Sequence, residues 1–558
     1  MALGQQNTTS SGSATLSNGP RATTRKRVLT FAGAHEFLVA SLGLVVLGAL
    51  VYAPHVLHGG FYLDDWSNGA VTLRPLGGGG FGQALSYFSK TTLYRPILVV
   101  YVPLTYEVFG THMAYQLAWA ATLAILVACV LYGVLRTLDV PTRHAWPIAA
   151  LTLVYPWFDS TRFWETADQA TLSILFAELG LWVALAGLSR RSLRIHAFAA
   201  LLYLLSILTY EITLPVIAGL GTLYWVRAGW REARTRWAVD LIAVLVGGLW
   251  VGTQTNHESY GLSANFSHFK EIVTSGGTML GRSIFPVGPQ RTTLALVAIA
   301  VVLVAASARL LARRRRNVVA GDWNLRSWVG LMIGGLVLAG LGWAMLIPAN
   351  PYYTPTVYGV TNRVNALAGF GLVIAVYATF GTVGMLIGEA RPKFRPLGGL
   401  VVVLLGLGLG VAYVKVLERH SRIWNEAYRA EAAGIGELKM QFPTLPRDTT
   451  VFVSGYPAYE TLGVPIFSSS WDVNGMIKLQ YKDGSLAAYP VIAGLSLACR
   501  ADGVGLEGAG APSVTAPYGT ARLLDVSTGL HTAPRNEREC RARAASYTSG
   551  PLTLSTSY

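Results

Sequence analysis

The side chains with the clearest chemical potential are two adjacent carboxylates, Asp64 and Asp65, in the sequence FYLDDW. Successive side chains of an extended segment point in opposite directions, so the two carboxylates cannot face the same partner. One of them, facing a reacting hydroxyl, would act as a general base, while the other orients a neighbour or holds a cation. The alternative is an ordinary acidic pair that caps a helix through its backbone amides.

Two arginines are candidates for binding a phosphate. Arg95 precedes Pro96, and Arg363 lies in NRVNALAGFG. A guanidinium is always charged and binds phosphate in a bidentate manner. The alternative is an arginine whose stem runs along lipid while its head reaches the headgroups. Glu211, in LTYEITLP, is expected to pair with one of them, because an unpaired carboxylate so close to hydrocarbon is costly.

A metal site is a weaker prediction. His257, Glu258 and His268 carry the right side chains, but their spacing matches no standard zinc site, which favours polar loop residues. Asp65 and His257 remain candidate ligands of a divalent cation such as Mg, Mn or Ca, and no cofactor is assigned.

Two of the three cysteines, Cys499 and Cys540, lie in the polar C-terminal region. A disulfide between them is plausible if that region faces an oxidising compartment. Two free thiols are the alternative.

The composition indicates which elements must position these residues. Of 558 residues, 52% are hydrophobic and 13% are charged, and the mean hydropathy is +0.43. A soluble protein would carry about 25% charged residues. Apolar runs of roughly 15–25 residues, long enough to cross hydrocarbon, separate short clusters of charge. The sequence therefore predicts an α-helical polytopic membrane protein.

The basic residues favour a membrane over a nucleic acid as their partner. The net charge is +15, but Lys and Arg form short clusters beside apolar runs rather than one continuous basic surface. Every cluster of two or more basic residues that flanks the short loops between these runs falls on the same side as Arg25, Lys26 and Arg27, which places the N-terminus in the cytoplasm. The composition, rich in Ala, Gly, Arg and Val, favours the plasma (inner) membrane.

The apolar runs predict about eleven transmembrane helices. They cover about residues 37–52, 113–135, 145–157, 170–188, 196–209, 212–226, 238–252, 292–311, 327–347, 364–388 and 397–414. A further apolar stretch, 96–109, is short and suits a helix lying in the interface.

Three segments follow from this pattern. Residues 1–34 read as a disordered cytoplasmic tail, and residues 35–415 as a transmembrane domain with its first outer loop at 54–112. In residues 416–558, short apolar runs alternate with Gly, Pro, Asp and Ser, which predicts a small extracytoplasmic α/β domain.

The candidate site residues all fall at the outer ends of the predicted helices. They are Asp64, Asp65, Arg95, Glu165, Asp168, Glu211 and Arg363. No predicted span has more than an occasional ionisable residue near its centre, whereas an ion pathway would need carboxylates at membrane depth. This distribution indicates a site at the level of the outer headgroups.

Several segments, in order, resemble the GT-C glycosyltransferases, and in particular their membrane O-mannosyltransferase-like branch. The likeness covers about residues 35–390 and is strongest over 60–220. The segments are FYLDDW, LYRPILVVYVPLTYEVFG, YPWFDSTRFWETADQATLSILF, LTYEITLP and NRVNALAGFG. Two features depart from the branch: Tyr210 stands where its eukaryotic members tend to have Lys, and the C-terminal domain shows no 34-residue repeat.

The resemblance implies a hexosyl- or pentosyltransferase that contributes to glycans of the cell envelope. The donor would be a sugar on a polyprenyl phosphate, the acceptor a hydroxyl of a glycan, lipid or protein on the outer face, and the anomeric centre would invert. Asp64 would be the base with Asp65 in support, and Arg95 and Arg363 would bind the donor phosphate. The residues that orient them would be Glu165, Asp168 and Glu211.

Two other classes of function compete with this one. A transporter or flippase for a lipid-linked or polar solute would carry polar residues at the membrane centre and an internal repeat of its spans, and neither is evident. A non-enzymatic scaffold would leave the acidic pair and the interfacial arginines without a role.

Overall fold

The computed structural model describes residues 20–72, 80–254, 261–289, 291–313, 323–357, 359–390, 392–461 and 463–554. The chain divides into two units, Met1–Gly43 and Leu44–Tyr558, and the domains and contacts described below belong to the second. The first helix, α1, runs from Pro20 to His58 and so begins inside the tail predicted to be disordered, whose residues 1–19 lie outside the described residues.

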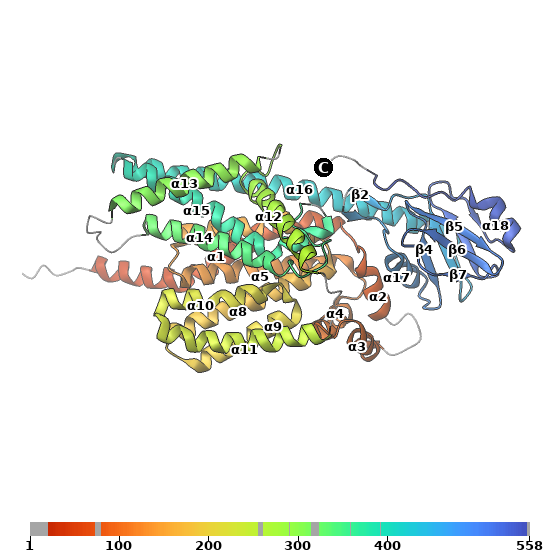
Figure 1. The fold of residues 1–558 in the computed structure, drawn as a ribbon, viewed down its shortest axis with the longest axis horizontal. Helices are drawn as coiled ribbons and strands as arrows, with labels where there is room; N and C mark the ends of the chain where they lie inside the picture. Colours follow the sequence, from red (N-terminus) through yellow and green to blue (C-terminus); the bar gives the residue numbers. More distant parts are fainter. Residues whose placement is uncertain are drawn as a thin grey trace, which may run out of the picture. The chain divides into compact units, whose positions relative to one another are not determined.

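The expected polytopic helical fold is confirmed (Figure 1). After α1 come α2 (Asp64–Thr72), α3 (Gly80–Thr91), α4 (Pro96–Phe109), α5 (Met113–Thr137), α6 (Thr142–Leu153), α8 (Asp168–Ser189), α9 (Leu193–Thr209), α10 (Leu214–Ala228), α11 (Trp230–Gln254), α12 (Leu262–Ile284), α13 (Thr292–Arg313), α14 (Leu325–Ala344), α15 (Ala366–Ala390) and α16 (Arg395–Gln441). Short helical turns between them include η1 (Pro156–Phe158), α7 (Ser160–Phe163), η2 (Glu165–Ala167), η3 (Glu211–Thr213), η4 (Gly359–Asn365) and η5 (Pro392–Phe394).

Each of the predicted crossings corresponds to a helix, but not every helix has the length of a span. Among the described residues, eight helices are long and apolar enough to cross a bilayer. The other three, α6, α9 and α10, have 12, 17 and 15 residues. At a rise of about 1.5 Å per residue these fall short of a full crossing unless flanking turns extend them.

The predicted loop between residues 252 and 292 is the clearest difference from the sequence analysis. It contains α12, a helix of 23 residues that packs on α13 and α15. Its exposed apolar side chains are Leu262, Phe266, Phe269 and Val273, spaced three or four residues apart on one face. Polar residues occupy much of the rest, so the segment lacks the continuous hydropathy by which spans are found.

Glycines let the two helices on either side of η4 approach closely. A Cβ on Gly335 or Gly342 of α14 would lie 2.7 Å from backbone atoms of α15, and one on Gly371 of α15 would lie 2.3 Å from the backbone of α14. Small residues at such contacts are typical of helix packing in membranes. The tight α14–α15 pair fixes the position of η4, which lies between them in sequence.

The helix α16 continues unbroken across the boundary expected at residue 415. It has 47 residues, and its buried side chains beyond the apolar half follow a helical spacing: Tyr413, Leu417, His420, Trp424 and Glu431. The expected helical segment 416–441 is therefore real, but it is the second half of the last membrane helix.

The C-terminal domain is the small α/β unit that the turn pattern predicts. The largest sheet has the order β4-β1-β8-β9, in which β1 is parallel to β4 and to β8. A second sheet, β5-β6-β7, is antiparallel, and β2 and β3 form a separate antiparallel pair. The elements are β1 (Thr450–Ser454), β2 (Tyr459–Thr461), β3 (Val464–Pro465), α17 (Ser470–Tyr481), β4 (Ala487–Pro490), β5 (Leu495–Arg500), β6 (Gly503–Gly508), β7 (Thr515–Ala516), β8 (Ala521–Asp525), β9 (His531–Thr532) and α18 (Glu537–Ala544). Cys499 and Cys540 form a disulfide that joins β5 to α18.

Candidate active site

Asp65 is fully buried in the first turn of α2. Its Oδ1 accepts hydrogen bonds from the backbone N–H (2.9 Å) and the hydroxyl (2.6 Å) of Thr166, and its Oδ2 accepts one from the N–H of Tyr62 (3.0 Å). Burial raises the pKa of this carboxyl well above its usual range, and the nearby Glu165 adds to the rise. Because protein donors occupy both oxygens, Asp65 holds the start of α2 in place, much as the capping alternative expects.

Asp64, one residue earlier, is only half-buried. Burial raises the pKa of its carboxyl, and the Arg363 guanidinium and the Trp471 side chain oppose that rise. Trp471, in the first turn of α17, is 52% exposed. Burial also raises the pKa of the next residue, Asp472, and the charge of Asp64 adds to this effect. Asp64 thus lies where α2, η4 and α17 meet.

Arg363, on η4, retains much of its capacity to bind an anion. Its Nη1 donates to the carbonyl oxygen of Val360 (3.2 Å), and its Cζ lies 5.0 Å and 5.9 Å from the ring centroids of Trp164 and Tyr353. Within the described part of the chain, no carboxylate forms an ion pair with it. A half-buried guanidinium between aromatic rings, with its charge not neutralised, suits a phosphate.

Arg95, the other candidate arginine, is already paired. Its Nε and Nη2 donate to the two carboxylate oxygens of Glu211 at 2.9 and 2.7 Å, and its Cζ lies 3.9 Å from the ring centroid of Tyr210. Burial alone would lower the pKa of Arg95, but the charge of Glu211 raises it overall. The pair joins the start of α4 to the turn between α9 and α10.

Glu165 and Asp168 are buried behind Asp65 and are held by tyrosines of α4. The hydroxyl of Tyr106 lies 3.1 Å from Glu165 Oε2 and 2.9 Å from the backbone oxygen of Asp65, and the hydroxyl of Tyr101 donates to Asp168 Oδ2 at 2.7 Å. Since α4 begins next to Arg95, this short helix connects the acidic residues to the arginine pair.

The C-terminal domain completes the surroundings of Asp64, because α17 packs against α2. A Cβ on Gly475 would lie 2.5 Å from backbone atoms of Trp66, so only glycine allows this approach. The indole N–H of Trp66 in turn donates to Glu431 of α16 at 3.1 Å. The membrane and C-terminal domains therefore both contribute to the walls around Asp64.

The sequence analysis missed the polar side chains that hold these segments together. Asn362 and His420 are buried and each is bonded to the buried Asp159, although the three residues come from distant parts of the chain. A signal was present: Asp159 is a lone carboxylate in the aromatic stretch YPWFDS, and asparagines lie on both sides of Arg363.

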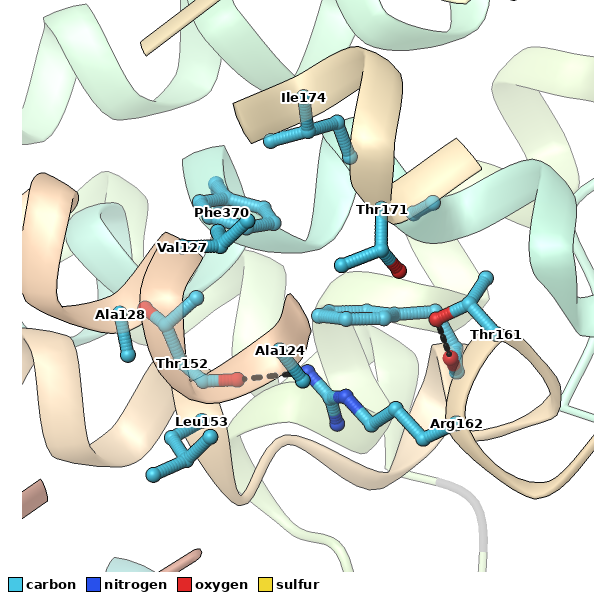
Figure 2. Close-up of a pocket in the computed structure, with 12 residues that line it drawn as sticks. Ala124, Val127, Ala128, Thr152, Leu153, Thr161, Arg162, Thr171, Ile174 and Phe370 are labelled. Carbon is cyan, nitrogen blue, oxygen red and sulfur yellow. Dashed lines mark hydrogen bonds between the residues drawn. The ribbon is translucent and has the colours of Figure 1, made fainter. Parts of the chain in front are cut away.

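The cavity shown in Figure 2 lies elsewhere, among α5, α6, α8 and α15. Its volume of about 10 Å³ has room for one water molecule. Arg162 lines it and donates to the carbonyl oxygens of Thr152 (3.0 Å) and Tyr155 (2.9 Å) at the end of α6. None of the predicted site residues lines this cavity, so it is a packing feature of the bundle.

Of the candidate metal ligands, His268 and Asp65 lie within the described residues, and protein groups engage both. His268 is buried on α12, and its ring nitrogens lie 3.4 and 3.2 Å from the carbonyl oxygens of Ile347 and Tyr353, so it anchors the loop between them. His257 and Glu258 lie outside the described residues. Among the residues with described positions, no three His, Cys, Asp or Glu side chains converge, and the Asp65 oxygens already accept protein hydrogen bonds.

No protein-family model matches this chain, and no curated protein matches it by sequence. Two solved structures of an oligosaccharyltransferase from Archaeoglobus fulgidus are similar to it. One, tethered to an acceptor peptide with an NVT sequon, shares 11% identity at a TM-score of 0.39, covering 83% of this chain and 64% of that one. The other, AglB with an inhibitory peptide and a dolichol-phosphate, shares 12% identity at a TM-score of 0.40, covering 82% and 65%.

This chain thus spans less than two thirds of the length of either neighbour. At this level of similarity the chemistry must be argued from the chain's own residues.

Proposed function

We propose that this chain is a membrane glycosyltransferase that moves a sugar from a polyprenyl-phosphate donor to an acceptor hydroxyl at the outer face. Asp64 and Arg363 carry the reaction, and Asp65, Glu165 and Asp168 form the buried support beneath them. The acceptor is a hydroxyl of a glycan, lipid or protein.

Asp64 is the general base. Its carboxylate accepts the proton of the acceptor hydroxyl as that oxygen attacks the anomeric carbon of the sugar. The bond between the anomeric carbon and the phosphate oxygen breaks, its electron pair stays on the phosphate, and the polyprenyl phosphate leaves. Direct displacement of this kind inverts the anomeric centre.

Arg363 binds the phosphate as charge accumulates on it. A cation aimed at the developing charge accelerates the reaction because it stabilises the transition state more than the ground state. Arg95 is less suited to this task, since Glu211 already neutralises it in a bidentate pair. Its role is to position α4, whose tyrosines bond Glu165 and Asp168.

One observation carries this proposal: the half-buried carboxylate of Asp64 interacts electrostatically with Arg363, and Arg363 forms no close ion pair with any carboxylate of the described residues. Buried charges are normally compensated within the protein. An arginine left without a carboxylate next to a candidate base is therefore best explained by an anionic ligand.

The disulfide supports the proposed sidedness. Disulfides persist in oxidising compartments, so the domain that contains Cys499–Cys540 is best placed outside the cytoplasm. The basic clusters that flank the helices support an N-terminus on the opposite, cytoplasmic side.

The decisive experiment supplies the purified protein with a radiolabelled sugar on polyprenyl phosphate and measures release of the lipid phosphate. A transferase releases it and a transporter does not, whereas a transporter reconstituted in vesicles accumulates the label without turnover. The variant Asp64→Asn should express and insert normally but release lipid phosphate far more slowly than wild type. Release at the wild-type rate by this variant would overturn the proposal.

A further inference from the structure

We infer that Asp159 is a positioning residue that holds Arg363 at the site through the side chain of Asn362. The inference rests on the proposed function, because it explains how the phosphate-binding arginine keeps its place.

The contact between Asp159 and Asn362 is buried and directional. Asp159 is 1% exposed and Asn362 is fully buried. The Nδ2 of Asn362 donates to Asp159 Oδ1 at 2.5 Å, and its Oδ1 accepts from the N–H (3.2 Å) and the hydroxyl (2.7 Å) of Ser160. Both ends of the amide are therefore engaged, which fixes its orientation.

Two further contacts hold η4 against the same region. The Nδ2 of Asn365 lies 2.8 and 2.6 Å from the carbonyl oxygens of Trp157 and Thr356, and the N–H of Val360 donates to Gly463 of the C-terminal domain at 2.7 Å. Arg363 lies between these anchors, and among the described residues its guanidinium hydrogen-bonds to Val360 within its own turn. The direction of the guanidinium is thus set by the anchoring of η4.

Asp159 also connects η4 to α16. Its Oδ2 lies 2.5 Å from Nδ1 of His420, so one carboxylate holds two segments that are about 60 residues apart in sequence. A buried carboxylate is costly unless it is well bonded, and removing one of its partners leaves an uncompensated charge. We therefore expect η4 to shift when the Asn362 side chain is replaced, because the alternative is a buried Asp159 carboxylate that has lost its donor.

The test exchanges the two side chains. Asn362→Asp places two carboxyl groups face to face, whereas Asp159→Asn/Asn362→Asp restores a donor opposite an acceptor. The readout is binding of farnesyl phosphate, a soluble prenyl phosphate, to the purified full-length protein. We expect Asn362→Asp to weaken binding about tenfold and the exchanged pair to return it to within about threefold of wild type.

A second variant avoids the added charge. Asn362→Ser cannot reach Asp159 and should weaken binding to a similar degree as Asn362→Asp. The matched control is Asn536→Asp at the exposed N-cap of α18, where Asn and Asp cap equally well, and its binding should equal that of wild type.

The outcomes separate the two proposals. If wild type fails to bind farnesyl phosphate, or if Arg363→Ala binds it normally, the proposed phosphate site falls and this inference falls with it. If Arg363→Ala loses binding while both Asn362 variants keep it, only the positioning role of Asp159 is overturned. Weak binding by the exchanged pair would also overturn it, since a general structural role predicts damage without rescue.

Discussion

Two groups of ionisable side chains differ in how far they are closed to solvent. The group at the candidate site, the Asp65 cluster, consists of Asp64, Asp65, Glu165, Asp168 and Arg363. The other, the His196 cluster, consists of His196, Arg236, Asp240, Tyr203 and Tyr224. About 15 residues separate His196 from the Glu211 turn along α9, which is roughly 20 Å of helix.

The His196 cluster is closed to solvent, although Asp240 Oδ2, His196 Nδ1 and Arg236 Nε have no hydrogen-bond partner among the described residues. His196 and Asp240 are fully buried and 3.0 Å apart, and Arg236, 1% exposed, donates to Ser192 and to Glu232. The Asp65 cluster has an equally buried base, but Asp64 and Arg363 at its edge are half-buried. Buried charge alone therefore does not mark a reactive site. The informative feature is that two charged side chains at the edge of the cluster, Asp64 and Arg363, remain partly exposed.

The largest expected effect concerns the open carboxylate. Asp64→Asn should slow transfer by about 10²–10⁴-fold, the usual contribution of a general base, with little change in thermal stability. The measurement is the initial rate of lipid-phosphate release at saturating donor. Asp139→Asn, at an exposed aspartate after α5, is the control and should keep the wild-type rate. If Asp64→Asn keeps the wild-type rate, the Asp65 cluster is no more reactive than the His196 cluster, and the comparison fails.

The closed cluster should respond in stability instead. Asp240→Asn breaks a buried pair and should cost about 3–5 kcal/mol of folding free energy. Thermal denaturation in detergent would measure the loss. The protein that remains folded should transfer sugar at the wild-type rate per molecule, and a selective loss of rate without loss of stability would contradict this assignment.

The unpaired arginine should affect donor binding. Arg363→Ala removes charge-assisted hydrogen bonds to the phosphate and should lower kcat/KM for the donor by about 10–100-fold. Steady-state kinetics at varied donor concentration would show this, and Arg363→Lys should retain part of the activity. An equal loss in Arg95→Ala, with Arg363→Ala unaffected, would transfer the phosphate-binding role to Arg95.

The paired arginine should behave as a structural element. Arg95 and Glu211 are 15% and 20% exposed, so a double-mutant cycle of Arg95→Ala and Glu211→Ala should give a coupling free energy of about 1–2 kcal/mol in unfolding. Unfolding followed by circular dichroism would provide the four values. Strictly additive effects would show that the pair does not hold α4.

The smallest effect is a shift in pH dependence. Burial raises the pKa of Asp64. The base therefore becomes ionised, and transfer accelerates, only at pH values above the usual pKa range of an aspartate. Because the Arg363 cation favours the ionised form, its removal should raise that pKa further. In Arg363→Ala the rising limb of rate against pH should therefore move to higher pH, and a limb that stays in place would separate the two residues.

The sequence predicted the fold better than the connections within the site. Long apolar runs such as those of α5 and α15 are recognisable in the sequence, because the hydrocarbon core requires a helix of a certain length and an apolar composition. The amphipathic α12 does not, because only one of its faces is apolar. Likewise, the sequence alone predicted that Asp64 and Arg363 lie at the same level of the membrane. It could not predict that Glu211 pairs with Arg95 and not with Arg363.

The links among Asp159, Asn362 and His420 were beyond reach for a different reason. They join residues that are 203 and 261 positions apart in the chain, and no local periodicity reports a contact over that distance. A lone acid in an aromatic stretch can only suggest that some partner exists.

The unbroken course of α16 makes the site sensitive to helical phase. Each residue inserted in this helix would rotate everything beyond it by about 100° and advance it by about 1.5 Å. One alanine added after Lys415 would turn His420, Trp424 and Glu431 away from the groups they now meet. Changes of length in this stretch should therefore be tolerated only in near-whole turns, although each of these residues would still be present in the sequence.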